Sequence, residues 1–285
     1  MSEKSRKFIK VESRDGITWV TLNRPEKRNA MSPALHDEMD EVLFELEDDP
    51  DTKVVILKGA GGNFSAGQDL KEFFRENEGK PRSARKAREQ ANRWRWERLY
   101  NYDKPTICMI EGYCVGGAFM QLLATDFVIA AEDATFSLSE VNWGILPGAL
   151  VSKVVADAVL YRHALWYACL GEPFDGVEAA RVGFINKAVP KESLVAETEA
   201  LAHKLMAKSP RVLRATKQAI RHVRTMDFGQ AYDYLAEKGK AIKVGDQEKS
   251  YETGLSQFLD KKSYKPVKSP FKLGTLLTDE TKSKK

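Results

Sequence analysis

A glycine-rich turn is the first feature of this chain whose residue types suggest chemistry. The apolar segment 106–110 predicts a buried strand, and the turn 112–117 after it leads into an apolar helix at 117–124. The first N–H groups of a helix have no internal partner, and the helix dipole adds partial positive charge there. Such a turn can stabilise negative charge on a ligand. Glycine pairs also serve close packing alone, so the turn needs support from a second feature.

An isolated glutamate supplies that second feature. Glu140 lies in the sequence Ser-Leu-Ser-Glu-Val-Asn-Trp and has no basic neighbour. Desolvation in such an apolar frame raises the pKa of a carboxyl group, which suits proton transfer near neutral pH. A lone glutamate is more often a solvated residue at an edge. A further glycine-containing turn at 64–70, however, can direct another N–H donor to the same oxygen, and together these features suggest an anion-stabilising catalytic site.

The composition indicates an ordinary globular protein. The chain has 285 residues, of which 42% are hydrophobic and 30% charged, and this suits one large α/β domain or a domain with a small appendage. The net charge of +4 fits an acidic small-molecule ligand as easily as a polyanion. No apolar run approaches the ~18 residues of a membrane span, and the first residues lack the apolar core of a signal peptide. We interpret the three cysteines as buried free thiols of a cytoplasmic protein: Cys108, Cys114 and Cys169.

Strand and helix signals alternate over the first half of the chain. Segments 8–11 and 17–22 flank a polar turn and predict a hairpin. Ser32, followed by proline, is the predicted N-cap of a helix with one apolar face. The apolar segment 53–58 predicts a strand covered on both faces, as in an α/β sheet. Strand–strand–helix units then recur at 53–100 and 105–125.

The second half is predicted to be mostly helical. Helices are expected at 152–169, 176–182, 191–208, 210–224 and within 228–261, with a short strand at 183–189. We predict a catalytic core over 1–200, a helical region over 201–265 and a disordered tail over 266–285.

A basic segment precedes the glycine-rich turn. Residues 80–98 include eight basic and two acidic side chains. We interpret the segment as a solvated helix that docks one face through Trp94 and Trp96. A surface for ligand phosphates or for nucleic acid is the alternative.

Five motifs give the chain a specific resemblance. In order and spacing they are similar to those of the crotonase (enoyl-CoA hydratase/isomerase) superfamily, and within it to the hydroxycinnamoyl-CoA hydratase-lyases. The resemblance implies a spiral of ββα units with a helical C-terminal trimerisation region. The motifs are LNRPEKRNAMS (22–32), SAGQDLKEF (65–73), KPTICMIEGYCVGGAF (104–119), ATDFVIAAEDATFSLSEVNWGILPG (124–148) and GLSQFLDKKSYKP (254–266).

The resemblance implies roles for the chemical residues. The N–H groups of Gln68 and Gly117 would form an oxyanion hole for an acyl thioester, with the helix dipole reinforcing Gly117. Hydratases of this superfamily place a water between two glutamates. The second falls on Glu140, whereas the first falls on Met120, which cannot deprotonate water. Glu140 is therefore the predicted sole acid/base.

The predicted acyl pocket is less polar than the resemblance alone would suggest. Hydratase-lyases hold a substrate phenol with tyrosines, and the aligned residues here are Phe73 and Ala236. Together with Met120 they make the pocket apolar, which weakens selection for a phenol. The same change disfavours the retro-aldol cleavage that a phenolate assists. Tyr232 and Tyr234 are alternative hydroxyl donors. Trp143 is a further residue that we assign to substrate binding.

Coenzyme A is the implied cofactor portion of the substrate, and neither a prosthetic group nor a metal is expected. The loop 24–30 would lie along the pantetheine and adenine, and Phe258 of a neighbouring subunit would complete the site in a homotrimer or dimer of trimers. Candidate contacts are Lys27, Arg28, Ala30, Ala66 and Lys261, the cations among them as phosphate partners.

Three functions remain open from the sequence. The first is an enoyl-CoA hydratase, with or without lyase activity, for a bulky or aryl-substituted acyl group. The second is an enoyl-CoA double-bond isomerase, because one carboxylate suffices to move a proton between carbons. The third is a nucleic-acid-binding or scaffold protein on the same fold, for which the basic segment and tail are the evidence. The intact turns and Glu140 favour an enzyme.

Overall fold

A computed structural model describes residues 6–246 and 249–263 of the chain. The chain divides into two compact units, Met1–Ala200 and Leu201–Lys285, and each is described by itself. None of the helices in the described ranges is long and apolar enough to cross a membrane. The strand-rich first unit contains the glycine-rich turns, and the second unit is helical.

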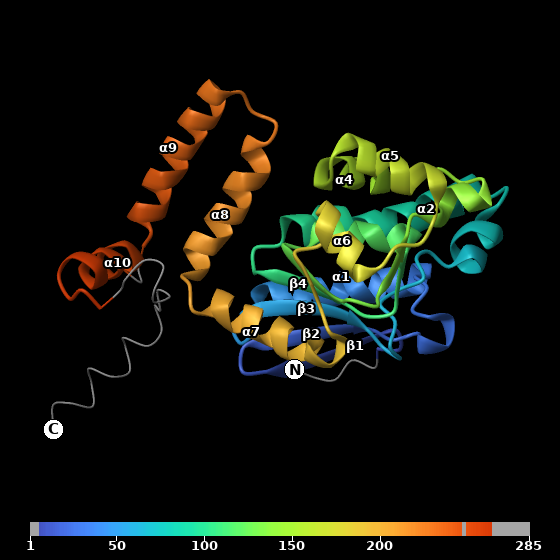
Figure 1. The fold of residues 1–285 in the computed structure, drawn as a ribbon, viewed down its shortest axis with the longest axis horizontal. Helices are drawn as coiled ribbons and strands as arrows, with labels where there is room; N and C mark the ends of the chain where they lie inside the picture. The colour runs from blue at the N-terminus through green and yellow to red at the C-terminus, as the bar shows by residue number, and fades with distance from the viewer. Residues whose placement is uncertain (1–5, 247–248, 264–285) are drawn as a thin grey trace. The chain divides into compact units, whose positions relative to one another are not determined.

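A six-stranded sheet forms the centre of the first unit, with strand order β1-β2-β3-β4-β6-β8 (Figure 1). Strands β1 and β2 form the predicted hairpin, and every other pair in the sheet is parallel. Two further strands, β5 and β7, pair in parallel to form a small second sheet. The strands are β1 (Ile9–Arg14), β2 (Ile17–Leu22), β3 (Val54–Gly59), β4 (Thr106–Ile110), β5 (Tyr113–Val115), β6 (Phe127–Ala131), β7 (Thr135–Ser137) and β8 (Lys187–Val189).

Helix α1 shows why the sequence folds as it does. The Ser32 side chain accepts a hydrogen bond from the Leu35 N–H, and Pro33 is the first helical residue, so the predicted cap is confirmed. The helix extends over Pro33–Asp48 and ends just before Pro50. Its apolar face is buried as predicted, and His36 is buried on the same face.

Further helices belong to the first unit. They are α2 (Pro81–Asn92), α3 (Phe119–Ala124), α4 (Val151–Ala158), α5 (Tyr161–Leu170), α6 (Gly176–Val182) and α7 (Leu194–Met206), which crosses the boundary between the units. Helix α2 packs on α1, α4 packs on α3 and α5, and α6 packs on β7 and β8. An aromatic cluster fixes α3 against β7 and its neighbours; its members are Phe119, Phe136, Tyr167, Phe174 and Phe184.

Several element boundaries differ from the sequence predictions. The segment 152–169 is two helices, because Val159 leaves helical geometry. The strand predicted at 183–189 is confined to β8, because Gly183 takes a φ of 96° and opens a turn. The helix starting at 117 begins with a 3₁₀ turn at Gly116–Ala118. Cys169 is exposed rather than buried, whereas Cys108 and Cys114 are buried.

The basic segment is a helix with exposed cations at 80–88 and Trp94 docked against the fold, as predicted, but Trp96 is exposed and the end of the segment differs. Helix α2 ends at Asn92, and a π-helical turn, Arg93–Arg98, continues it. Within this turn Trp94 and Arg95 are fully buried. Arg98 pairs with Asp40 and Glu47 of α1.

The second unit consists of α8 (Pro210–Val223), α9 (Phe228–Val244) and α10 (Ser250–Leu259). Asp227 and Gln230 form a reciprocal capping box that starts α9. Helices α8 and α9 contact each other through Gln218 and Lys238, which are 2.8 Å apart. The tail predicted for 266–285 lies outside the described residues.

Candidate active site

The turn after β3 carries the first predicted donor, Gln68. The Ser65 N–H donates to Tyr113 O at 2.8 Å, and the Val115 N–H donates back to Ser65 O at 3.1 Å, so this turn lies beside β5. The N–H of Asp69 donates to Met31 O. Gly67 takes a φ of 89°, which a residue with a side chain adopts only with strain. The backbone thereby turns the N–H of Gln68 away from the neighbouring ladder.

The turn after β5 carries the second predicted donor, Gly117. A Cβ atom added to Gly117 would lie 3.6 Å from Gln68 N, and one added to Gly67 would lie 3.3 Å from Gly117 N. The two predicted donors are therefore neighbours in space, although 48 residues of chain lie between them. Within the described ranges neither N–H has a hydrogen-bond acceptor. Two free N–H groups side by side can stabilise an oxyanion, each by about 3 kcal/mol.

Glu140 lies against the same glycine turn. It belongs to a short 3₁₀ helix, Ser139–Trp143, and its carboxylate is close enough to Gly116 that an added Cβ would be 3.3 Å from Oε1. Its Oε2 atom is buried without a hydrogen-bond partner among the described residues. Desolvation by burial raises the pKa of this carboxyl group, as the apolar sequence frame predicted. A proton acceptor therefore lies next to the two free donors.

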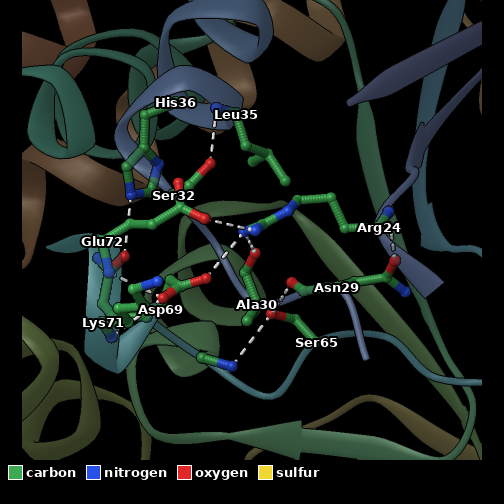
Figure 2. Close-up of polar contacts among 12 residues, drawn as sticks. Arg24, Asn29, Ala30, Ser32, Leu35, His36, Ser65, Asp69, Lys71 and Glu72 are labelled. Carbon is green, nitrogen blue, oxygen red and sulfur yellow. Dashed lines mark hydrogen bonds and ion pairs between the residues drawn. The ribbon is translucent and has the colours of Figure 1, made fainter. Parts of the chain in front are cut away.

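A buried ion pair holds the first donor turn in place (Figure 2). Nη1 of Arg24 donates to Asp69 Oδ2 at 3.1 Å and to Ala30 O at 2.6 Å, and Nη2 donates to Glu72 Oε1 at 2.8 Å. The other oxygen of Asp69 accepts from the N–H groups of Lys71 and Glu72. Asp69 thus caps the following turn and ties it to the loop 24–30.

Loop 24–30 is itself rigidly folded. Asn29 accepts from the Arg24 N–H at 2.9 Å and donates to the carbonyls of Ala60 and Asn63. Arg28 and Asn29 both have left-handed backbone conformations, with φ of 48° and 55°. Hydrogen bonds of this density fix the loop beside the donor turn.

Four predicted coenzyme A contacts meet at this loop. The Ala66 N–H donates to Arg28 O at 2.8 Å, which joins the loop to the donor turn. Ala30 and Ala66 are half-buried, whereas Lys27 and Arg28 are exposed, with the Arg28 guanidinium over the ring of Tyr113. The other two predicted contacts, Phe258 and Lys261, are exposed in the second unit.

The predicted acyl-site residues are divided between the two units. In the first unit Phe73 and Met120 are buried, and Trp143 is 64% exposed. Phe73 directs an edge contact at the ring of His36, with 5.9 Å between ring centroids. In the second unit Tyr232 and Ala236 are exposed on α9, and Tyr234 stacks near His222. Phe73 and Met120 are apolar and buried, and their role in acyl binding stays a prediction.

Buried polar residues behind the donor turn were not predicted. His36 accepts at Nδ1 from the Trp94 indole N–H, and its Nε2 is 2.9 Å from Gln68 Oε1. Burial and the charge of Arg95 lower the pKa of His36 to about 3, so the imidazole is neutral. In the sequence these residues belong to a helix face and a basic segment, and neither pattern marks them as partners of Gln68.

The described residues contain no cluster of three or more histidine, cysteine, aspartate or glutamate side chains suited to a metal ion. The two N–H donors and the carboxyl group together form the chemical set at this site. That set can stabilise an enolate-like oxygen and move a proton at the adjacent carbon.

Comparisons with known proteins agree with this geometry. The family model for enoyl-CoA hydratase/isomerase matches residues 12–266. The chain is 48% identical to hydroxycinnamoyl-CoA hydratase-lyase of Pseudomonas fluorescens, over 93% of this chain and 97% of the relative. It is 34% identical to carnitinyl-CoA dehydratase of Escherichia coli K12, over 77% of this chain and 82% of the relative.

A solved structure shows the same fold. An enoyl-CoA hydratase from Bacillus anthracis superposes with a TM-score of 0.81 at 28% identity, covering 89% of this chain and 96% of that one. The sequence resemblance and the crotonase-like fold are confirmed by these matches. The chain belongs to the enoyl-CoA hydratase/isomerase family.

Proposed function

We propose that the protein is an enoyl-CoA hydratase that adds water across the α,β double bond of a bulky or aryl-substituted acyl-CoA. Glu140 takes a proton from water as the water oxygen bonds to the β-carbon. The electron pair of the double bond moves toward the thioester oxygen, where the N–H groups of Gln68 and Gly117 hold the enolate. Glu140 then returns the proton to the α-carbon, so that one water is added overall.

The position of Glu140 is the observation that supports this function. Its carboxylate is desolvated, has one buried oxygen without a partner among the described residues, and contacts the glycine next to a free N–H donor. A carboxyl group that served only to cap or pack would be expected to use that oxygen in a hydrogen bond. The relative from Pseudomonas fluorescens, a hydratase-lyase by name, supports the same reaction class.

A double-bond isomerase is the second candidate, because Met120 occupies the position of the other hydratase glutamate. One carboxyl group can move a proton from one carbon of an acyl chain to another without any water. The products separate the two reactions: hydration increases the mass of the acyl-CoA by one water, whereas isomerisation leaves it unchanged. A panel of aliphatic and aryl α,β-unsaturated acyl-CoAs, analysed by mass spectrometry, decides between them.

A nucleic-acid-binding role loses part of its support. Of the basic segment at 80–98, Arg95 is buried and Arg98 is paired with two carboxylates. Arg93 lies 3.8 Å from Asp40. Arg95 and Arg98 are therefore used within the fold, whereas the cations at 80–88 are exposed and the Arg93 side chain is 51% exposed.

Replacement of Glu140 tests the proposed function directly. Glu140→Gln should lower kcat by about 10²–10⁴-fold with little change in acyl-CoA affinity, since the amide cannot exchange the proton. Because its raised pKa means that ionisation is disfavoured in the folded state, the wild type loses stability as the pH rises through that pKa. The amide variant should therefore be at least as stable as wild type at neutral pH, which serves as the folding control. Retention of most of the wild-type kcat would disprove the assignment.

The pH dependence gives a second readout. Glu140 must be ionised to act as a base, so kcat/KM should fall as the pH drops below its raised pKa. The acid limb should lie above 4.5, the ordinary pKa of a glutamate. A limb at or below that value would show that another group titrates.

The apolar side chains of the proposed acyl pocket predict that the enzyme does not prefer phenolic substrates. Phe73 and Met120 are buried and offer no hydroxyl, and burying a phenol hydroxyl without a partner costs about 1–3 kcal/mol. A 4-hydroxylated cinnamoyl-CoA should then have a kcat/KM no higher than its unsubstituted counterpart, with slow release of aldehyde. A strong preference for the phenol, lost in Tyr232→Phe or Tyr234→Phe, would overturn this and assign a full hydratase-lyase.

We also propose that the active protein is a trimer or a dimer of trimers in the cytoplasm, with Phe258 and Lys261 completing a coenzyme A site. Large apolar side chains exposed on the first unit support an interface; they include Trp143, Leu146, Leu160, Tyr161 and Trp166. Sedimentation of a catalytically active monomer would contradict this assembly.

A further inference from the structure

Arg95 is a buried cation that the proposed reaction has not yet used. Its side chain is in the π-helical turn after α2, and the residue is only 1% exposed. Among the described residues no carboxylate pairs with it. Removing a charged group from water without a partner costs several kcal/mol, so a fold seldom keeps such a residue without a gain elsewhere.

The contacts of Arg95 converge on the two oxyanion donors. Its Nε donates to Ala91 O at 2.7 Å, which holds the guanidinium to its own helix. Its Nη1 is 3.4 Å from Gly117 O. With the side-chain amide of Gln68 turned so that its oxygen faces the guanidinium, Nη1 and Nη2 donate to that oxygen at 3.2 and 3.3 Å. Arg95 therefore touches both residues whose N–H groups face the thioester oxygen.

The surroundings of Gln68 contain more donors than acceptors. Because the Trp94 indole donates to His36 Nδ1, the single proton of the neutral imidazole is on Nε2 and points at the Gln68 amide. Arg95 also points its donors at that amide, so two donors compete for one oxygen. A pocket with surplus donors carries positive potential, and negative charge on a nearby ligand relieves it.

We propose that Arg95 is a positioning residue that acts through Gln68 and Gly117 to strengthen the oxyanion hole for the enolate of the thioester. The inference rests on the proposed function for its ligand, an acyl-CoA. In the free protein the buried charge is poorly compensated. In the enolate complex, negative charge develops on the far side of the two residues that the guanidinium contacts, and the electrostatic energy of both charges falls.

The test compares Arg95→Met, Arg95→Lys and a control in the same turn, Arg98→Met. The methionine removes the charge at similar length, and the lysine keeps the charge without the planar fork. Arg98 is paired with Asp40 and Glu47, so its loss should lower stability without altering the oxyanion hole. Kinetics, melting temperature and the infrared carbonyl stretch of a bound, isotope-labelled saturated acyl-CoA are measured for each.

Arg95→Met should lower kcat by about 10–100-fold, somewhat less than loss of a direct oxyanion donor, and leave KM nearly unchanged. The carbonyl stretch of the bound thioester should shift back toward its value in water. Arg95→Lys should retain most of the wild-type kcat and most of the wild-type shift of the carbonyl stretch. Arg98→Met should change neither quantity. Unchanged kcat and carbonyl stretch in Arg95→Met would overturn the inference and leave a purely structural cation.

A second pair of variants covers a failure of Arg95→Met to fold. Gln68→Leu removes the side-chain amide and keeps the backbone donor. If Arg95 acts through that amide, Arg95→Gln, which removes the charge but keeps a polar amide, should alter the carbonyl stretch less in the Gln68→Leu background than in wild type. Equal shifts in both backgrounds would contradict action through Gln68.

The carbonyl measurement separates this inference from the proposed function. It needs only a bound thioester and no turnover. A wild type that binds but does not hydrate, with a stretch that still depends on Arg95, would refute the function and leave the inference standing.

Discussion

The two turns that present the oxyanion donors are held in place by opposite means. The turn around Gln68 is fixed by side chains, including the buried pair of Arg24 with Asp69 and the bonds of Asn29 (Figure 2). The turn around Gly117 is fixed by the absence of side chains. A Cβ on Gly112 would lie 2.2 Å from Gly62 O, and one on Gly117 would lie 3.0 Å from Gln68 Cγ.

This difference predicts two kinds of failure. The first turn should be damaged by losing a charge or hydrogen bond, and the damage should appear as lost stability, because buried polar groups are left unpaired. The second turn should be damaged by gaining a single carbon atom, and the damage should appear mainly in activity, because the added atom meets the catalytic carboxylate. The backbone of an active-site turn can thus be held either by contacts of its side chains or by close packing that only glycine permits.

The largest effect is expected from Asp69→Ala. The change leaves the Arg24 guanidinium, whose side chain is 6% exposed, with the partly exposed Glu72, the Ala30 carbonyl and the Phe8 ring as partners, and removes the cap of the following turn. Breaking a buried ion pair from one side costs about 3–5 kcal/mol, and chemical denaturation measures it. Arg14→Ala, which breaks the exposed pair with Asp15, is the control and should cost less than about 1 kcal/mol. Equal losses in the two variants would show that the Asp69 pair is not a special constraint.

Gly116→Ala tests the second turn, around Gly117, by adding a single carbon atom. Gly116 has a φ of 55°, so alanine carries a backbone cost of about 1–2 kcal/mol, and its Cβ would press on Glu140 Oε1. Activity should fall by about 10–100-fold, as small displacements of a catalytic group produce. Gly79→Ala is the matched control, because Gly79 has a φ of 69° and no atom within 4 Å of the added Cβ. It should show the backbone cost with full activity per folded molecule; parallel losses of activity in both variants would contradict contact with Glu140.

The same contrast explains how much of the site could be predicted from the sequence. Glycines in a strand-to-helix turn and a glutamate in an apolar frame are local signals, and the structure brings the two glycine turns and Glu140 together as those signals suggested, whereas the choice of Gln68 and Gly117 as donors came from the family resemblance. Ser32, as the N-cap of α1, was equally local. Such features depend on residues within a few positions of one another, so single-sequence patterns report them.

The supports behind the first turn are not local. Arg95 lies in a segment with eight basic residues, where the pattern predicts solvent exposure, and its burial depends on packing that the sequence does not display. His36 is buried on the apolar face of α1, and its partners are Trp94 and Gln68, 58 and 32 residues away. Arg24 meets Asp69 across 45 residues. Buried polar partners over such separations were the part that pattern reasoning missed.

The smallest predicted effect concerns pH and also distinguishes the two turns. His36, which supports the first turn, has a folded pKa of about 3 against 6.5 in the unfolded chain. The unfolded state therefore binds the proton first, and stability falls as the pH drops below 6.5 until the folded pKa is reached. At pH 5.5 this single group should cost about 1.2 kcal/mol relative to pH 7, a loss that His36→Gln should remove. Denaturation curves at several pH values for the two proteins measure the difference. If their stabilities fall in parallel between pH 7 and 5, the pKa of His36 is not lowered in the fold, and His36 is not the group that couples acid to the first turn.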